Sequence, residues 1–525
     1  MISSTAKAIP ATGAFILQRL FTSLYTIWLN YFNIAVLWAS PSEKLSLPPE
    51  LLDLVFSFAD VNSLMTCSKA LESTDLCALV HKWLYRDVLV YRSQGNRQVT
   101  GNDEKRLYIS DSHFLKLLKS KRNGRSKPNT HVRALCILLA GSGIERQTPW
   151  SILFQPALLP CLRTLVLSSD TGSFQRQGEK WGECDLAFRK AFLNRLAWMG
   201  KDGTGGIEEA SFSVEGFPAK DLERCVRLRK LTLTTKLDFS APPLLSKLNT
   251  GPKDLQLQDL TINHLSQLDG FKKWLIPSRT GCMISDLRSL DFSCINADHL
   301  ESFRNILESC KNRLQELTVN FGPDLFCSCN DVSGPGLASL AEPWNQALKP
   351  TLASVLRLRA LCALQKLTIC SRIQSREVMF VSNLPNEKPL ERKHYRSSIR
   401  EIGAFLQEEW TPTSAKSRCK LELKIAFFQD DPDGASLAEM DFEPFLRSVP
   451  VDFQARQDGS VFEPAFIMKI IGYRKLHPYQ PLETIPVVNL AADVRKNEVL
   501  RQMNMEGKIR VLAIPGVVGG LTLSE

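Results

Sequence analysis

A short hexad of aliphatic residues recurs along the middle of the chain and limits the fold more than any other feature. Each copy has the pattern aliphatic-x-x-aliphatic-x-aliphatic, and residues 132–369 contain seven copies. Apolar residues that alternate over a short run are typical of a β-strand with one buried face. The copies are VRALCI from Val132, LRTLVL from Leu162, LRKLTL from Leu228, LQDLTI from Leu257, LRSLDF from Leu287, LQELTV from Leu314 and LQKLTI from Leu364.

The spacing of the hexads indicates a repeat. Successive copies start 30, 66, 29, 30, 27 and 50 residues apart, and four of these six spacings lie close to the period of leucine-rich repeats. IEEASFSV (207–214) fits an irregular unit inside the longest interval, HLESFRNILESC (299–310) a helical return, and LELKI (421–425) one more strand. Because only stacked units bury a shared core, we expect an α/β fold with an irregular leucine-rich-repeat solenoid over residues 131–430. The alternative is an ordinary α/β domain in which the hexad is only a strand pattern.

The residues that alternate with the aliphatic ones are expected on the opposite face of the strands, where a target protein could bind. Three successive hexads place a carboxylate there, namely Asp259, Asp291 and Glu316. We expect these three residues to form an acidic substrate-binding patch, and the alternative is that they are ordinary solvated positions. The full set is Thr164, Val166, Lys230, Thr232, Asp259, Thr261, Ser289, Asp291, Glu316, Thr318, Lys366 and Thr368.

Residues 45–92 have a helical pattern instead. Pro48 and Pro49 suit a first helical turn, and an apolar stripe with helical spacing follows. Asp60-Val61-Asn62-Ser63 supplies a break and a capping side chain before a second helix, and a third is expected through Trp83. The first stripe consists of Leu47, Leu51, Leu54, Val55 and Phe58.

The segment LPPELLDLVFSFADVNSLMTCSKAL (47–71) resembles the F-box, particularly its fungal versions, which often continue to a segment like HKWLYRDV from His81. Ala59 stands where a leucine is usual, and Lys69-Ala70-Leu71-Glu72 replaces the family's Arg-x-Trp pattern. The resemblance implies docking onto the Skp adaptor of an SCF-type cullin ubiquitin ligase, while the repeats hold a protein target for degradation. The residues assigned to the adaptor contact, or to the helix packing behind it, are Leu47, Pro48, Leu51, Val55, Phe56 and Leu64.

The N-terminal segment 20–39 carries no charge and is long enough to cross a bilayer. Two observations argue against a membrane anchor. The segment contains five polar residues, and Lys7 and Arg19 precede it. By the positive-inside rule, these two charges would place the helical module outside the cytoplasm. A signal peptide fits poorly, because the small-x-small cleavage pattern is incomplete. We therefore expect residues 1–44 to be a hydrophobic leader of uncertain role, either amphipathic or wrongly assigned, and the protein to be cytoplasmic or nuclear, with an anchor or signal peptide as alternatives.

The remaining segments carry weaker signals. Residues 93–130 are polar and basic, apart from a short helical pattern of Phe114, Leu117 and Leu118, and are expected to form a linker. Residues 431–525 show no interpretable pattern. The net charge of +10 is spread along 525 residues, and the basic run 116–127 lacks interleaved aromatic residues. No nucleic-acid partner is therefore expected.

Motifs for catalysis or metal binding are missing from the sequence. The glycine-rich segment 200–206 has neither Walker nor dinucleotide-loop spacing, no Gly-x-Ser-x-Gly elbow occurs, and the seven histidines are isolated. Cys327 and Cys329 have no second pair at zinc-site spacing, and the other cysteines are scattered in a way that suits a reducing compartment. We expect no enzyme activity, catalytic residue, metal or cofactor. Besides a ligase adaptor, the sequence leaves open a repeat scaffold without ligase attachment and a membrane-associated binding protein.

Overall fold

The computed structural model has a mixed α/β fold with a large, mainly parallel sheet. The chain divides into two compact units: Met1–Leu138 with Gln155–Leu162 and Gly459–Val461, and Leu139–Phe154 with Arg163–Asp458 and Phe462–Glu525. The leader (1–44) lies outside the described residues. These are 49–71, 76–91, 106–119, 128–139, 150–169, 180–200, 205–244, 255–263, 268–276, 284–295, 300–321, 357, 360–374, 402, 405, 420–429, 436–439, 442, 466–474, 483–505 and 510–514.

Three helices open the described part of the first unit, as the sequence predicted: α2 (Pro49–Phe58), α3 (Val61–Ala70) and α4 (Leu76–Leu84). Asp60 caps α3, because its carboxylate accepts hydrogen bonds from the backbone N–H and the hydroxyl of Ser63, both at 2.8 Å. This contact satisfies one of the unpaired donors at the helix start and fixes the bend between α2 and α3.

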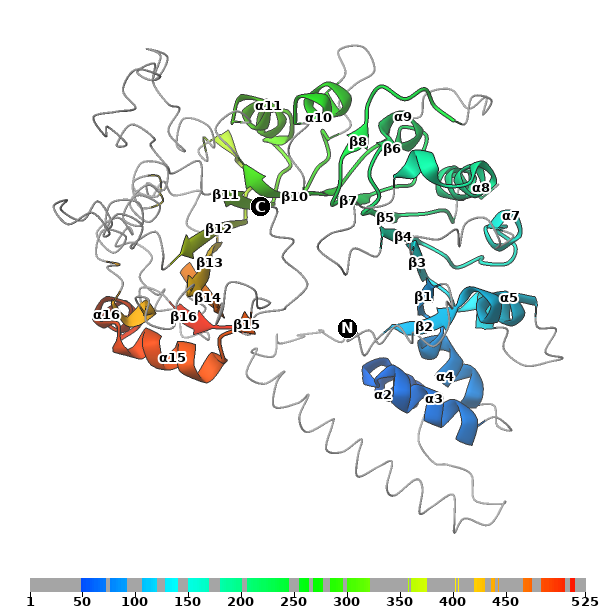
Figure 1. The fold of residues 1–525 in the computed structure, drawn as a ribbon, viewed down its shortest axis with the longest axis horizontal. Coiled ribbons are helices and arrows are strands. Elements are labelled where there is room, and N and C mark those ends of the chain that lie inside the picture. Colours follow the sequence, from blue (N-terminus) through cyan, green and yellow to red (C-terminus); the bar gives the residue numbers. More distant parts are fainter. Residues whose placement is uncertain are drawn as a thin grey trace, which may run out of the picture. The chain divides into compact units, whose positions relative to one another are not determined.

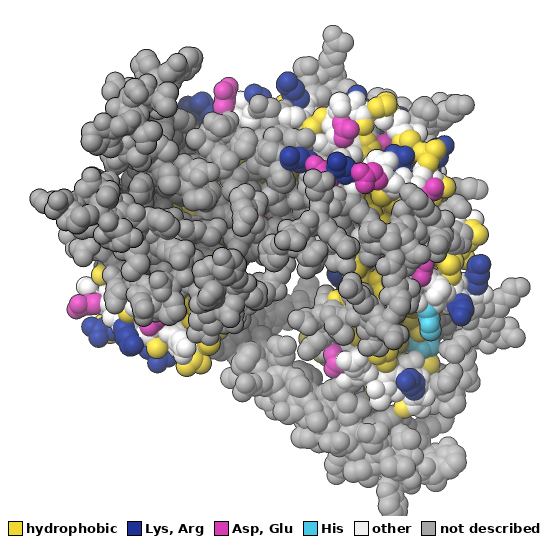
Figure 2. Space-filling model, viewed as in Figure 1, with side chains coloured by type: hydrophobic (Ala, Val, Ile, Leu, Met, Phe, Trp, Pro, Cys, Tyr) yellow, Lys and Arg dark blue, Asp and Glu magenta, His cyan; other side chains and the backbone are white. Residues whose placement is uncertain are grey.

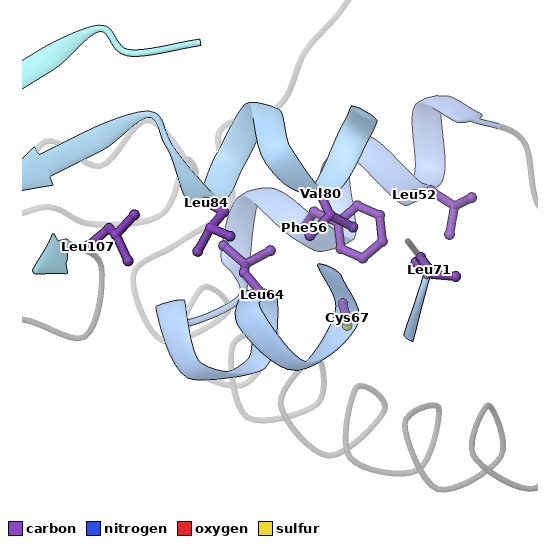
Figure 3. Packing of buried hydrophobic residues seen from close by; sticks show 8 residues of the cluster. All are labelled: Leu52, Phe56, Leu64, Cys67, Leu71, Val80, Leu84 and Leu107. Atoms are coloured by element: carbon purple, nitrogen blue, oxygen red, sulfur yellow. The ribbon is translucent and has the colours of Figure 1, made fainter. Parts of the chain in front are cut away.

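Figure 3 shows how apolar side chains from these helices converge on one core. Helix α2 contributes Leu52 and Phe56, which lie one turn apart on the same face of the helix. Leu107 follows the helices in sequence and joins the same core. The cluster consists of Leu52, Phe56, Leu64, Cys67, Leu71, Val80, Leu84 and Leu107.

Three parallel strands of the large sheet complete the first unit. Strand β1 (Asp87–Tyr91) pairs with β2 (Leu107–Ser110) and with β3 (Ala134–Leu139), and helix α5 (Asp111–Lys119) follows β2 directly. The structure therefore differs from the expected linker over residues 93–130, which contains β2 and α5. A four-residue strand is too short to give a clear alternation in the sequence, whereas Phe114 and Leu118 of α5 do show the helical spacing of a buried stripe.

The second unit is organised by a sheet in which strands far apart in sequence pair in parallel (Figure 1). Each strand lies beside the next one along the chain, so every return segment adds one strand to the same edge. The order is β4 (Thr164–Ser169), β5 (Glu209–Phe212), β7 (Lys230–Leu233), β9 (Asp259–Ile262), β10 (Ser289–Ile295), β11 (Glu316–Phe321), β12 (Lys366–Gln374), β13 (Lys420–Gln429) and β14 (Phe466–Arg474).

The hexads occupy these strands in matching register, which confirms the strand prediction. Leu260 of β9 faces Leu231 of β7 on one side and Leu290 of β10 on the other. The three aliphatic positions are buried in every hexad except the last, where Leu364 is half-buried. The irregular unit 207–214 and the segment 421–425 also form strands, β5 and β13.

Helices α8 (Leu186–Ala197), α10 (Leu268–Leu275) and α11 (Leu300–Cys310) lie on the apolar side of this sheet (Figure 1). Phe303 of α11 meets Phe292 of β10 edge to face, with ring centroids 4.8 Å apart. Phe192 of α8 meets Phe212 of β5 at 6.1 Å. The shorter elements on this side are α7 (Trp150–Leu153), η2 (Trp181–Glu183), α9 (Ala219–Leu222), and the paired strands β6 (Phe217–Pro218) and β8 (Leu237–Asp238).

The glycine-rich segment after α8 makes a tight turn where it is described. Gly205 and Gly206 have φ of 77° and 103°, a region that side chains with a Cβ rarely adopt. A Cβ on Gly206 would also lie 2.8 Å from the carbonyl oxygen of Trp198. The glycines are therefore required by the backbone.

Residues beyond 430 continue the sheet, although the sequence indicated no structure there. β14 pairs along its length with β13, and β16 (Arg510–Ala513) and β15 (Glu483–Thr484) pair with β14. Gly472 of β14 permits close packing, because a Cβ there would lie 2.9 Å from the Cβ of Ile485. The other elements are η9 (Leu437–Glu439), α15 (Val487–Lys496) and α16 (Glu498–Met505). The sheet thus extends past the boundary expected at residue 430.

Candidate functional site

Helix α2 has two apolar faces. Leu52 and Phe56 point into the core, whereas Leu54 and Phe58 remain 47% and 64% exposed. Met65 of α3 is a third large apolar residue of this helical module that is exposed, at 38%. Covering exposed apolar side chains on binding lowers the free energy, so Leu54 and Met65 mark the candidate docking surface of the first unit.

The residues predicted to bind the adaptor fall into three groups. Leu47, Pro48 and the side chain of Leu51 lie outside the described part of the chain. Val55 is half-buried. Phe56 and Leu64 are 1% and 3% exposed and belong to the core, so their role is the helix packing behind a contact. The apolar stripe predicted from the sequence included Leu54 and Phe58 but not Leu52. Leu52 lies four residues before Phe56, so helical spacing would have placed it on the same face as Phe56.

A polar contact fixes α2 against α4 beneath this surface. The carboxylate of Asp53 accepts hydrogen bonds from Nζ of Lys82, at 2.7 and 2.9 Å, and from Nε1 of Trp83 at 2.8 Å. The Arg86 guanidinium stacks over the Trp83 ring, 4.9 Å from its centroid. These contacts orient α2, and with it Leu54 and Phe58.

A second polar cluster lies between α3 and α4. Nε2 of His81 is 2.9 Å from the hydroxyl of Ser68 and 3.4 Å from the thiol of Cys77. His81 was expected to be isolated, although its spacing of four from Cys77 was visible in the sequence. Because His81 and Cys77 are only 5% and 8% exposed, this cluster holds the two helices together and offers no access to a substrate.

The three predicted carboxylates lie on one face of the second unit's sheet, which we call the polar face. Asp259 and Glu316 flank Ser289 in register, and Asp291 follows two residues further along β10. Burial raises the pKa of Asp259, Lys230 opposes this, and the nearby charge of Glu316 adds to the increase. Lys230 and Lys366 are the register neighbours of Asp259 and Glu316, so lysines bound this row of acidic residues on both sides.

The same face carries a lysine cluster on β12, β13 and β14 that the sequence did not reveal. Its centre is Glu422, which is 8% exposed, and its carboxylate oxygens lie 2.8 Å from Nζ of Lys469, 3.7 Å from Lys424 and 4.0 Å from Lys366. Burial acts to raise the pKa of Glu422, but the hydrogen bond and positive charge of Lys469, together with the charges of Lys424 and Lys366, lower it overall. Glu422 is therefore held as a carboxylate. We call Lys366, Glu422, Lys424 and Lys469 the lysine–glutamate cluster.

Charged side chains of both signs also alternate along the described surface near the top of the view in Figure 2. Among the described residues, no group of three or more His, Cys, Asp or Glu side chains is placed to hold a metal ion. No helix in the described part of the chain is long and apolar enough to cross a membrane.

Comparison with protein-family models and with curated proteins gives no match to this sequence.

Proposed function

We propose that the protein is a substrate-recognition adaptor of an SCF-type cullin ubiquitin ligase. In this proposal the helical module α2–α4 docks onto a Skp-type adaptor, and the sheet of the second unit, as an irregular leucine-rich-repeat solenoid, holds a protein target. Such a protein breaks and forms no bond itself. It raises the effective concentration of the target beside the enzyme that carries ubiquitin.

The observation that carries this proposal is that the helical module buries Leu52 and Phe56 in its core while Leu54 of α2 and Met65 of α3 stay 47% and 38% exposed. These two apolar side chains are not part of the core cluster of the module. A contact with another protein would bury their exposed part, and the gain is about 1 kcal/mol for each half-exposed side chain. The resemblance of residues 47–71 to an F-box favours a Skp-type adaptor as the partner.

The regular ladder of the second unit supports the other half of the proposal. Parallel strands in chain order, with helical returns on one side, leave a polar face of Thr, Asp, Glu and Lys side chains on the other. Extended surfaces of this type are used for protein recognition.

The proposal is tested by capture of a purified Skp-type adaptor with the full chain and with a Leu54→Lys/Met65→Lys variant. We expect the variant to lose about ten-fold or more in affinity, because two apolar contacts of the interface are replaced by charges. A matched control is Leu186→Lys/Val488→Lys, which changes two exposed apolar residues of the second unit.

The control variant should bind the adaptor like the parent protein, and both variants should keep their circular dichroism spectra. If the parent protein captures no adaptor, the ligase function is rejected, and a repeat scaffold without ligase attachment becomes the better account. Equal binding by parent and Leu54→Lys/Met65→Lys would instead show that the adaptor contact does not use this surface of the helical module.

A further inference from the structure

The polar face of the sheet is divided by charge. Strands β9, β10 and β11 contribute Asp259, Asp291 and Glu316. Strands β12, β13 and β14 contribute Lys366, Lys424 and Lys469 around Glu422. Since β11 and β12 are neighbours in register, the acidic and basic parts adjoin each other at the pair Glu316 and Lys366.

The lysine–glutamate cluster has more positive than negative charge. Three lysines surround one carboxylate, so three positive charges less one negative charge leave two in excess. The side chains of Lys366 and Lys424 remain 44% and 40% exposed, which leaves their ammonium groups accessible. The buried carboxylate of Glu422 attracts the three lysines. Because two positive charges remain in excess, the lysines can bind a further anion.

Asp291 sets the boundary of this basic area. Burial raises the pKa of Asp291, and the positive charge of Lys424 opposes this rise, so the two groups interact across the boundary. Burial also raises the pKa of Cys370, on which both Lys424 and Asp291 act. An extended polyanion would therefore be repelled as soon as it reached β10. The charge pattern favours a ligand whose own charge changes sign along its length.

We propose that the polar face binds an extended segment of the target in which a basic residue and an anionic residue lie about three positions apart. The spacing follows from the geometry of the sheet. The strands β10 and β11 carry Asp291 and Glu316, and β12 and β13 carry Lys366 and Lys424, so the two sites lie two strand intervals of about 4.8 Å apart. An extended chain advances about 3.3 Å per residue and covers this distance in about three residues. The basic residue binds Asp291 and Glu316, and the anionic residue, either a carboxylate or a phosphate, binds Lys366 and Lys424.

This inference rests on the proposed role of the sheet in target binding, and it adds the chemistry of the bound segment. It does not depend on adaptor docking, because the surface belongs to the second unit. The two proposals can therefore fail independently. Adaptor capture tests the contact of the helical module, and peptide binding by the full chain alone tests the polar face.

The experiment measures fluorescence anisotropy of short labelled peptides with the full chain at low salt. The peptides carry two arginines and two glutamates, or two arginines and two phosphoserines, on a Gly-Ser background with different separations. We expect binding to be tightest at the predicted separation, and the glutamate and phosphoserine series show which anion is preferred. An all-arginine peptide and an all-glutamate peptide should both bind more weakly.

The variant Lys366→Gln/Lys424→Gln should lower affinity for the matched peptide by about five-fold and remove the preference for its anionic half. Lys366→Arg/Lys424→Arg keeps the charges and should retain binding. Lys190→Gln/Lys273→Gln makes the same charge change at exposed residues of α8 and α10, and it should have no effect.

Three outcomes would overturn the inference. The first is no measurable binding of any peptide, or equal binding at all separations. The second is an undiminished affinity of Lys366→Gln/Lys424→Gln. The third is that a single-stranded oligonucleotide binds more tightly than every peptide and that Lys366→Gln/Lys424→Gln abolishes this binding. The cluster would then be a nucleic-acid site.

Discussion

Trp83 donates a hydrogen bond from its indole Nε1 to Oδ1 of Asp53, 2.8 Å away, and so joins the third helix of the helical module to the first. Lys82 binds the same carboxylate. Burial acts to raise the pKa of Asp53, but the hydrogen bonds from Lys82 and Trp83 and the charge of Lys82 outweigh it and lower the pKa.

The lowered pKa of Asp53 predicts a pH-dependent contribution to stability. A carboxyl group whose folded pKa lies below its unfolded value stabilises the fold above the unfolded pKa, and this stabilisation is lost as the pH falls through the folded pKa. Between neutral pH and about pH 3, the parent protein should therefore lose more stability in urea titrations than Asp53→Asn does. Trp83→Phe should reduce the free energy of unfolding at neutral pH by about 1 kcal/mol. An Asp53→Asn variant with the same pH profile as the parent protein would refute this account.

The buried and exposed faces of α2 predict a large loss of stability for one alanine substitution and almost none for the other. Phe56→Ala should reduce the free energy of unfolding of the helical module by about 3–5 kcal/mol, because a fully buried aromatic side chain leaves a cavity. Leu54→Ala should change it by less than about 0.5 kcal/mol, because that side chain is already half in water. Chemical denaturation monitored by circular dichroism measures both, and a large loss for Leu54→Ala would contradict the assignment of that face as exposed.

The strands that can be predicted from the sequence are those in which apolar residues recur with a regular spacing. The hexads predict their strands because three aliphatic positions recur with the same spacing, and Leu231, Leu260 and Leu290 do lie side by side. Strand β14 is as long as β12, but FIMKIIGYR has apolar residues at most of its positions, so no alternation identifies its buried face.

The candidate sites are less predictable, because they depend on residues that only the register brings together. The acidic residues Asp259 and Glu316 belong to copies of the same hexad, so their shared face follows from the repeat. The lysine–glutamate cluster combines Lys366, Lys424 and Lys469 from three strands, and only the first of these strands belongs to the seven hexads. In α2, helical spacing gives two apolar stripes, and only packing decides that Phe56 faces the core.

The close approach of β14 and the chain before α15 predicts a strict requirement for glycine. In Gly472→Ala, the new Cβ would lie 2.9 Å from Cβ of Ile485 and 3.2 Å from Cδ1 of Leu490, so backbone or helix must shift. Overpacking of this kind costs about 1–3 kcal/mol in the free energy of unfolding. Gly182→Ala is the control, since no atom lies within 4 Å of a Cβ there, and thermal unfolding should separate the two variants.

The acidic residues of the polar face lead to the last prediction. Asp259, Asp291 and Glu316 lie on three adjacent strands about 4.8 Å apart, and their side chains project from the same face. Charges at an interface contribute to orientation and to the association rate more than to affinity. A basic segment of the target should therefore be captured more slowly when these charges are reversed.

Changing Asp259, Asp291 and Glu316 together to Lys should sharply reduce target capture and leave adaptor binding unchanged, because the proposed adaptor contact lies on the helical module of the first unit. Quantitative mass spectrometry of proteins recovered with the parent chain and with the variant measures both effects in one experiment. Glu183→Lys/Glu301→Lys/Glu498→Lys is the matched control, since it makes the same change in net charge at exposed residues off the polar face. If the control loses the same proteins as the variant, net charge accounts for capture, and undiminished capture by the variant would place recognition on another surface.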